Sequence, residues 1–512
     1  MSAQRLRLAA LCWLFVAAPV TAVPAAELTG GDALVRVYDA ILDARFAAAE
    51  AELDKACGPA PAEACDVLAA TLTWWRIQID PESRALDNRF SAQTERAIAS
   101  TEAWIAREPE NAEAHFYAGG AYAARVQWRV LRDEKLAAAR DGKRIKQALE
   151  RAIALDPDLG DAYFGIGLYQ YYADVAPAAA KMLRFFLMLP GGDRDEGLAQ
   201  MRRARDEGQL LRGEADYQLH IIYLWYEKRA DLAAQLLESL NDRYPGNPIF
   251  TAELAELQDR YQHDVTASLA TWRSLLAAAR AHRVNEAGVA EAQARLGIAR
   301  QLEALHQTDA ALEELRPLLA ARAVRPVGAM AAAYLAIGEG EDRLGHRDAA
   351  VAAYKLAVAA APTPDPQQLR RRAAEHMRHK PDAAAAEAYR LSLEGLRKHE
   401  QGDLAGAQSA LAQSLRLDPR QPVARYRYAR VLAAKKDDDA ALEQFEGALR
   451  DAHDCPAPIA AAAYYDAARA HERLANKEKA IEYYRAASTW FGASAETRSA
   501  AHRALRRLHA AP

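Results

Sequence analysis

The sequence is poor in several features that define other protein classes. Its 512 residues include only 4 cysteines, 26 glycines and 22 prolines, which excludes a disulfide-rich scaffold, a collagen-like chain and a low-complexity protein. Charges of opposite sign nearly balance, with 66 Lys and Arg against 70 Asp and Glu. A mildly acidic chain without a basic tail gives no reason to expect nucleic acid as a partner.

What the chain has in excess is alanine, which makes up close to a quarter of it, within a hydrophobic fraction of 51%. Alanine is the strongest helix former, and few glycines or prolines interrupt the alanine-rich segments. The composition therefore favours an all-α protein. At this length we expect three or four globular domains unless one repetitive architecture covers most of the chain.

The N-terminus has the pattern of a secretory signal peptide. Arg5 and Arg7 precede an apolar stretch over 8–20, and small residues suited to cleavage follow at Ala22 and Ala25. The apolar stretch is shorter than the ~18 residues of a membrane span, and no later segment could cross a bilayer. We therefore predict a signal peptide over 1–25 and an exported mature chain without a transmembrane segment. The periplasm is the expected location, with secretion as the alternative.

Three cysteines remain after the predicted cleavage. Cys57 and Cys65 flank the segment CGPAPAEAC, whose glycine and prolines form a turn between helices expected over 33–56 and 65–79. In an oxidising compartment this arrangement predicts a structural disulfide. A redox pair is the alternative, but the spacing is not C-x-x-C. Cys455 is either a free thiol or an intermolecular link.

A repeat is plainest in the C-terminal half. Segments 402–419, 437–449 and 476–488 share one pattern, in which a small residue is followed four positions later by a large one. The small residues are Ala407, Ala441 and Ala480, and the large ones are Leu411, Phe445 and Tyr484. A small residue where two antiparallel helices cross allows close approach, and a bulky one fills the adjoining space. The pattern thus indicates stacked helix pairs.

The same pattern continues upstream in AAAYLAIGEGEDRLGHRDAAVAAYKLAVAAAP, where Gly338 and Ala350 are followed by Tyr354, Ala357 and the terminating Pro362. This segment resembles the tetratricopeptide repeat (TPR), and the resemblance extends over roughly 65–495. It implies a right-handed TPR-type α-solenoid of antiparallel helix pairs, with almost no strand. Two repeats in the N-terminal half carry insertions. As a whole, the sequence is similar to exported bacterial TPR proteins of unassigned function.

Changes in composition divide the chain into six segments. Residues 362–386 contain four prolines and a basic run, which predicts a joint with a short helix inside. The segments are the signal peptide (1–25), an N-terminal helical region with the Cys57–Cys65 pair (27–111), expanded aromatic-rich TPR-like repeats (112–250), middle TPR-like repeats (251–362), the joint (363–386), and C-terminal TPRs with a capping helix (387–512).

The resemblance also implies where a partner would bind, because the first helix of each TPR faces the concave groove. In the C-terminal repeats this places a charged and aromatic set there: Tyr426, Arg430, Tyr465, Arg469, Glu472 and Arg473. In the N-terminal half it places an aromatic set there: Phe164, Tyr171, Tyr172, Trp225 and Tyr226. Two interpretations of the aromatic set stay open. It forms an apolar groove for a ligand, or the insertion over 181–190, with Phe185 and Phe186, folds back and fills it as core.

The sequence contains no recognisable catalytic, phosphate-binding or dinucleotide-binding motif. The basic run Arg370–Arg372 is an alternative anion-binding patch, and His376 and His379 could share a helical face without a third metal ligand. We predict no enzyme activity, no cofactor and no metal.

The predicted function is a non-enzymatic extracytoplasmic TPR scaffold or adaptor that binds a protein or peptide in its concave groove. The alternative is a binding protein for a small apolar or lipid-like ligand in the aromatic N-terminal half.

Overall fold

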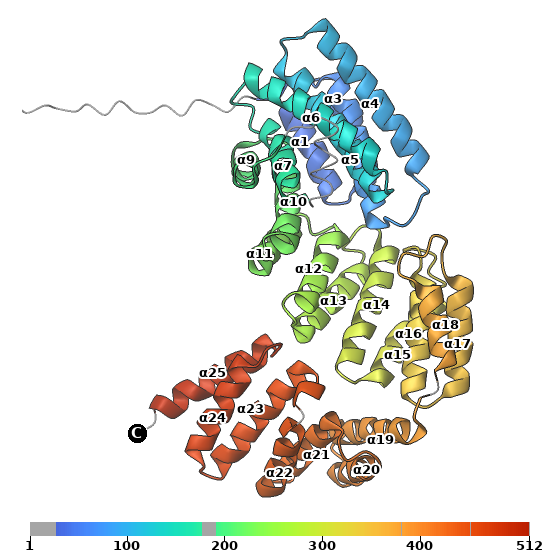
Figure 1. The fold of residues 1–512 in the computed structure, drawn as a ribbon, viewed down its shortest axis with the longest axis vertical. Coiled ribbons are helices and arrows are strands. Elements are labelled where there is room, and N and C mark those ends of the chain that lie inside the picture. The colour runs from blue at the N-terminus through green and yellow to red at the C-terminus, as the bar shows by residue number, and fades with distance from the viewer. Residues whose placement is uncertain (1–26, 177–190, 380, 451, 511–512) are drawn as a thin grey trace, which may run out of the picture.

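The computed structural model describes residues 27–176, 191–379, 381–450 and 452–510. The predicted signal peptide and the insertion residues Phe185 and Phe186 lie outside this part of the chain. Within it every regular element is a helix, and no β-strand occurs. The helices follow one another along a curved stack (Figure 1), so the prediction of an all-α solenoid is confirmed.

The helix bounds are as follows. In the N-terminal half they are α1 (Gly31–Leu42), α2 (Phe46–Ala56), α3 (Ala62–Ile79), α4 (Asp87–Arg107), α5 (Ala112–Leu131), α6 (Lys135–Leu155), α7 (Ala162–Val175), α9 (Arg194–Glu207), α10 (Arg212–Trp225) and α11 (Ala230–Arg243). In the middle they are α12 (Pro248–Arg260), α13 (Val265–Arg280), α14 (Ala287–Ala304), α15 (Thr308–Ala320), α16 (Ala329–Arg343), α17 (Arg347–Ala360) and α18 (Leu369–Arg378). The C-terminal part has α19 (Ala383–Glu400), α20 (Leu404–Leu417), α21 (Pro422–Ala434), α22 (Asp438–Arg450), the short 3-10 helix η1 (Ala452–Asp454), α23 (Ala457–Arg473), α24 (Lys477–Thr489) and α25 (Ala495–Ala510).

Most helices pack as antiparallel pairs with their neighbour in sequence, and the small residues of the repeat lie where the helices cross. At Gly338 on α16, an added Cβ would come within 2.4 Å of the Tyr354 ring on α17, and at Gly395 on α19 it would come within 2.4 Å of Leu411 on α20. Both large residues are fully buried. Close approach of the two backbones therefore depends on the missing side chain at these positions.

The first expanded repeat uses its additional residues to lengthen both of its helices. Helix α5 has 20 residues and α6 has 21, whereas a later pair such as α16 and α17 has 15 and 14. The longer pair extends the apolar surface available for packing in the N-terminal half.

The N-terminal helices fold back across the stack, so that α1 contacts α10 and α3 contacts α12. The carboxylate of Glu214 on α10 is buried and accepts hydrogen bonds from the Tyr38 hydroxyl and the Trp75 indole N–H, each at 3.1 Å. The turn after α1 binds the turn after α11, where the Asn247 amide donates to the Leu42 carbonyl at 2.7 Å. The first superhelical turn, from α1 to α12, is therefore held closed by direct contacts between its two ends; we call it the closed N-terminal turn.

One helix expected from the sequence is divided in two. The segment 33–56 forms α1 and α2 rather than a single helix, and the expected helix 65–79 begins earlier, at Ala62. The break lies at Ala44, whose φ of 56° is left-handed. An alanine rarely adopts this conformation, and no glycine or proline marks the position. The break lets α1 and α2 pack against each other.

The predicted joint contains the short helix α18, which packs against α16 and α17. The following helix α19 meets the turn between α14 and α15, where the Tyr389 and Thr308 hydroxyls are 2.9 Å apart. The buried Arg427 on α21 donates to the His306 carbonyl in the same turn, at 2.7 Å. The stack therefore changes direction at the joint.

The last helices return toward α12 and α13 (Figure 1). The Phe491 ring, after α24, lies 4.8 Å from the His263 ring in the turn between α12 and α13. Arg498 on α25 and Asp264 form an ion pair at 3.6 Å. The middle and C-terminal repeats thus form a nearly closed arc.

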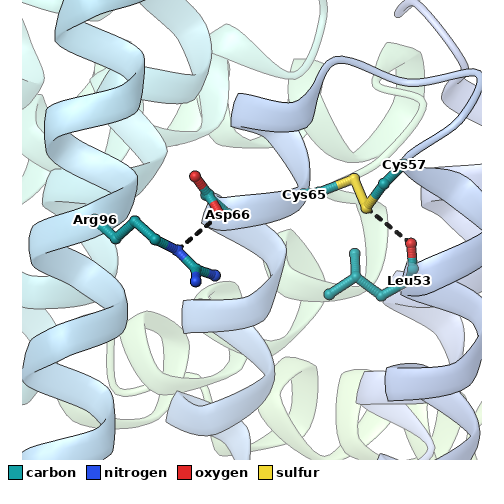
Figure 2. Close-up of a disulfide and its surroundings, with 5 residues drawn as sticks. All are labelled: Leu53, Cys57, Cys65, Asp66 and Arg96. Atoms are coloured by element: carbon teal, nitrogen blue, oxygen red, sulfur yellow. Dashed lines mark hydrogen bonds and ion pairs between the residues drawn. A yellow bond between two sulfur atoms is a disulfide. The ribbon is translucent and has the colours of Figure 1, made fainter.

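Cys57 and Cys65 are joined by a disulfide that links the end of α2 to the start of α3 (Figure 2). Next to it, Arg96 on α4 pairs with Asp66 on α3 at 2.9 Å, so three successive helices are tied together at this point. Cys455 is free and buried. In the described part of the chain, no helix is long and apolar enough to cross a bilayer, and no cluster of His, Cys, Asp and Glu has the arrangement of a metal site.

Candidate functional site

A groove of about 800 Å³, here called the middle groove, lies on the inner side of the middle repeats. It is lined by the consecutive first helices α12, α14 and α16, by side chains of the second helices α13 and α15 that reach between them, and by α18 and the turn after α3. The first helices contact one another directly, which places them on the inside of the curve. Its floor is apolar and consists mainly of Trp272, Leu296, Leu315, Ala332, Leu335 and Ala336.

The rim of the middle groove is acidic. Six carboxylates line it against three guanidinium groups; the acids are Asp80, Glu82, Glu253, Glu256, Glu303 and Glu339, and the bases are Arg260, Arg300 and Arg372. Burial raises the pKa of Glu303, while the nearby Arg343 opposes that effect. Four of the six carboxylates already pair with an arginine, and Glu82 makes no ion pair with any described residue. The apolar floor therefore suits an apolar segment, and Glu82 suits a basic residue beside it.

A second hollow, here called the C-terminal pocket, has a volume of about 240 Å³ and lies between the first helices α19, α21 and α23. Arg430 on α21 and Arg469 and Arg473 on α23 surround a single lining carboxylate, Asp466. His399 on α19 completes the polar wall. Three guanidinium groups against one carboxylate make this pocket basic.

The arginines of the C-terminal pocket differ in whether an acidic side chain of the protein already pairs with them. Arg473 pairs with Asp438 at 2.5 Å, and Arg469 lies 3.7 Å from Asp466. Arg430 stacks over the Tyr426 ring at 5.8 Å and makes no ion pair with any described residue. Its guanidinium is therefore the group best placed to bind an added carboxylate or other anion.

The pKa shifts in the C-terminal pocket agree with this excess of positive charge. Burial raises the pKa of the Asp466 carboxyl, while Arg430 and Arg469 act against it. Burial, and then Arg430, lower the pKa of His399, which favours the neutral imidazole. The pocket thus holds its positive charge on arginine, whose charge does not change near neutral pH.

The six residues predicted for the C-terminal groove divide into two groups. Arg430, Arg469 and Arg473 line the C-terminal pocket, and the Tyr426 hydroxyl reaches its edge by donating to Asp466 at 3.3 Å. Tyr465 and Glu472 lie on another face of α23. Tyr465 packs against Tyr484, and Glu472 accepts from Tyr484 and from Arg507 on α25.

The aromatic residues predicted for the N-terminal groove do not form one continuous surface. Tyr171, Tyr172 and Tyr226 make edge-to-face contacts, with ring centroids 5.5–5.9 Å apart. Trp225 is 58% exposed, whereas Phe164 is buried and lines a separate internal pocket. The predicted role of residues 181–190 in filling this region falls outside the described residues.

Sequence reasoning missed Asp466 and His399, although Asp466 could have been found. Residues 466, 469 and 473 recur at helical spacing and therefore share one face of α23. His399 carries no comparable signal, because its position depends on how α19 packs beside α21. The middle groove was also missed, because its lining comes from helices and turns that are distant in sequence.

Two family models, both described as tetratricopeptide repeat, match adjacent parts of the chain, residues 398–462 and residues 461–491. Together with the stacked helix pairs, they decide the superfamily. The chain contains tetratricopeptide repeats over residues 398–491. The C-terminal pocket of this TPR protein lies within the matched residues, whereas the middle groove precedes them. Among curated proteins, no sequence matches the TPR protein.

Solved structures similar to this TPR protein include several repeat proteins. The human IFIT1 dimer with PPP-AAAA is 14% identical, with 83% of this chain and 94% of that chain covered and a TM-score of 0.34. A tetratricopeptide repeat protein from Parabacteroides merdae is 15% identical, with 58% and 98% covered and a TM-score of 0.26. The TPR2AB domain of yeast Sti1, in complex with pHSP90, is 14% identical, with 58% and 97% covered and a TM-score of 0.23. Similarity this low does not extend their ligands to this TPR protein.

Proposed function

We propose that this TPR protein is a non-enzymatic scaffold or adaptor that binds a segment of a partner protein along the inner side of its middle and C-terminal repeats. The observation that carries the proposal is the middle groove, with its apolar floor and acidic rim on consecutive first helices. A groove of about 800 Å³ accommodates several side chains of a helix or an extended strand.

The charges of the two hollows specify the chemistry of the partner. The apolar floor of the middle groove favours a segment with apolar side chains, and the carboxylate of Glu82 on its rim favours a lysine or arginine beside them. The C-terminal pocket favours a carboxylate elsewhere on the same partner, because Arg430 is not paired with an acid of the described chain. A partner with a basic apolar segment and a separate acidic residue would satisfy both hollows.

Location outside the cytoplasm is part of the proposal. The signal-like segment 1–25 supports it, and so does the Cys57–Cys65 disulfide, since such bonds persist in oxidising compartments. We propose the periplasm, with secretion as the alternative. The alternative function, the binding of a small apolar ligand by the predicted aromatic groove, loses support because that set is dispersed.

The groove is tested by photocrosslinking in the native compartment. A photoreactive residue is placed at Ala332 in the middle groove and, as a matched control, at the exposed Lys355 on the outer helix α17 of the same repeat. We expect a discrete protein product from position 332 and none from 355. Mass spectrometry of the product identifies the partner segment, which should carry basic residues beside its apolar ones.

Binding of that segment to the purified chain is then measured by calorimetry. Ala336→Arg places a long charged side chain on the groove floor and should weaken binding at least tenfold, whereas Lys355→Glu should leave it unchanged. Equal crosslinking from both positions, or unaltered affinity of the Ala336→Arg variant, would contradict the proposed groove.

Export is tested separately by expressing the full chain in a Gram-negative host. The mature protein should be recovered from the periplasm with its N-terminus beginning after Ala22 or Ala25. Leu14→Arg, which interrupts the apolar stretch, should keep the chain in the cytoplasm. Recovery of an uncleaved wild-type chain from the cytoplasm would contradict export.

A further inference from the structure

A pocket that plays no part in the proposed function lies within the closed N-terminal turn, at the meeting of α1, α3, α5, α6, α7 and α10. We call it the N-terminal pocket. Its volume is about 70 Å³ and its wall is largely apolar, with Leu68, Trp74, Phe116, Leu149 and Phe164 as its main side chains. Of the aromatic set predicted from the sequence, only Phe164 contributes to it.

The acidic groups at the polar side of this pocket already have partners. Asp161 accepts from the backbone N–H groups of residues 209, 210 and 211 at 2.7–3.1 Å. Glu214 accepts from the Tyr38 hydroxyl and the Trp75 indole. These carboxylates hold α7, α1 and α3 against α10, so they have a structural role and are not free to bind a ligand.

One buried polar group in the wall has no hydrogen-bond partner among the described residues. Tyr117 is 1% exposed and lines the pocket, and its hydroxyl makes no hydrogen bond with any described residue. Burial raises the pKa of Tyr117, and the nearby carboxylates of Glu113 and Asp161 add to that effect. Neither carboxylate accepts a hydrogen bond from the Tyr117 hydroxyl. A buried hydroxyl without a partner is unfavourable, because it has lost its hydrogen bond to water and gained none in the protein. An acceptor atom placed in the pocket would supply the missing hydrogen bond.

We infer that the N-terminal pocket binds a small, mostly apolar molecule carrying one hydrogen-bond acceptor oxygen, which the Tyr117 hydroxyl recognises. The size follows from the volume, since about 10–15 Å³ admits one water-sized group and 70 Å³ therefore admits a molecule of roughly six non-hydrogen atoms. The apolar wall favours a hydrocarbon body over a cluster of waters, because water needs several polar partners.

The inference is tested with a pair of probes that differ only at the acceptor. Cyclohexanone has an apolar ring and a carbonyl oxygen, whereas methylenecyclohexane has the same ring with a CH₂ group in place of that oxygen. Binding to the purified mature chain is measured by ligand-observed NMR titration. The wild-type protein should bind cyclohexanone more tightly than methylenecyclohexane by about 2- to 13-fold, the factor for one hydrogen bond.

Two variants separate recognition from packing. Tyr117→Phe removes only the hydroxyl, so it should weaken cyclohexanone binding by the same factor and leave methylenecyclohexane unaffected. Gly120→Leu should abolish binding of both probes by filling the pocket, since a Cβ at Gly120 would meet only Val67, at 3.4 Å. Gly142→Leu is the matched control on α6, where nothing lies within 4 Å of the added Cβ, and it should bind both probes as the wild type does.

Each contrary result would overturn the inference. If neither probe binds the wild-type chain, the pocket holds only water. If Gly120→Leu binds as well as Gly142→Leu, the probes bind elsewhere on the protein. If Tyr117→Phe binds cyclohexanone as tightly as the wild type, the hydroxyl does not recognise the acceptor. Circular dichroism of each variant establishes that the helices are retained.

Discussion

The contact between Gly338 and Tyr354 gives the sharpest test of the packing in this repeat protein. In Gly338→Ala the new Cβ would lie 2.4 Å from the nearest ring carbon of Tyr354, well inside any normal contact distance. The ring cannot easily withdraw. It is fully buried, its hydroxyl donates to Asp342 at 2.9 Å, and the His376 ring stacks on it at 5.4 Å.

The magnitude follows from two opposing effects. Overpacking of this kind costs about 1–3 kcal/mol, and replacing glycine by alanine inside a helix gains about 1 kcal/mol. Gly142→Ala provides the control, because it gains helix propensity and meets no neighbour within 4 Å. The propensity gain cancels in the comparison, so Gly338→Ala should be less stable than Gly142→Ala by about 1–3 kcal/mol.

The assay is urea unfolding followed by circular dichroism, with hydrogen exchange of the α16 and α17 amides to locate the loss. Stabilities of separate repeats in a solenoid can differ, so the exchange data assign the change to the altered pair. Equal stability of the two alanine variants would refute the argument that this glycine is required for close helix approach.

Three further predictions concern the closed N-terminal turn. Cys57→Ser with Cys65→Ser should lower the free energy of unfolding by about 2.5 kcal/mol for a closed loop with a sequence separation of 8, and a reducing agent should destabilise the wild type but not this variant in urea unfolding. Burial raises the pKa of Glu214 above its ordinary value of 4.5, so the stability that the protonated carboxyl contributes is present below pH 4.5 and is lost as pH rises through the folded-state pKa. The stability of the wild type relative to Glu214→Gln should therefore fall as pH rises from 4.5 toward neutral. A constant difference in stability across that range would exclude the effect. Asp161→Ala removes the acceptor of three backbone N–H groups before α10. It should lower the free energy of unfolding by on the order of 3 kcal/mol and speed hydrogen exchange over 209–213. Unchanged exchange there would be inconsistent with this role of Asp161.

The sequence was sufficient to predict the helix pairs, because their packing is local. Small residues 34–39 positions apart, each followed by a large one, specify where two neighbouring helices cross, and Gly338 with Tyr354 is packed accordingly. The two cysteines flanking a glycine- and proline-containing turn were also sufficient to predict their pairing. Both features depend on residues close together in the chain.

Features that depend on the course of the whole solenoid could not be predicted in the same way. The contact of Tyr38 and Trp75 with Glu214 spans more than 130 residues and depends on small rotations accumulated over several repeats. The break at Ala44 has no sequence signal. The division of α23 into two faces was in principle readable, since adjacent positions such as Tyr465 and Asp466 differ by about 100° around the helix.

The measurement that tests the proposed function most directly is hydrogen exchange of the mature chain with and without the partner segment identified at position 332. Binding along the inner side predicts slower exchange in the first helices α14 and α16, while the outer helix α17, which contributes no residue to the groove lining, changes little. Protection confined to α17, or absent from α14, α16 and α17 alike, would contradict the claim that the middle groove is the binding surface.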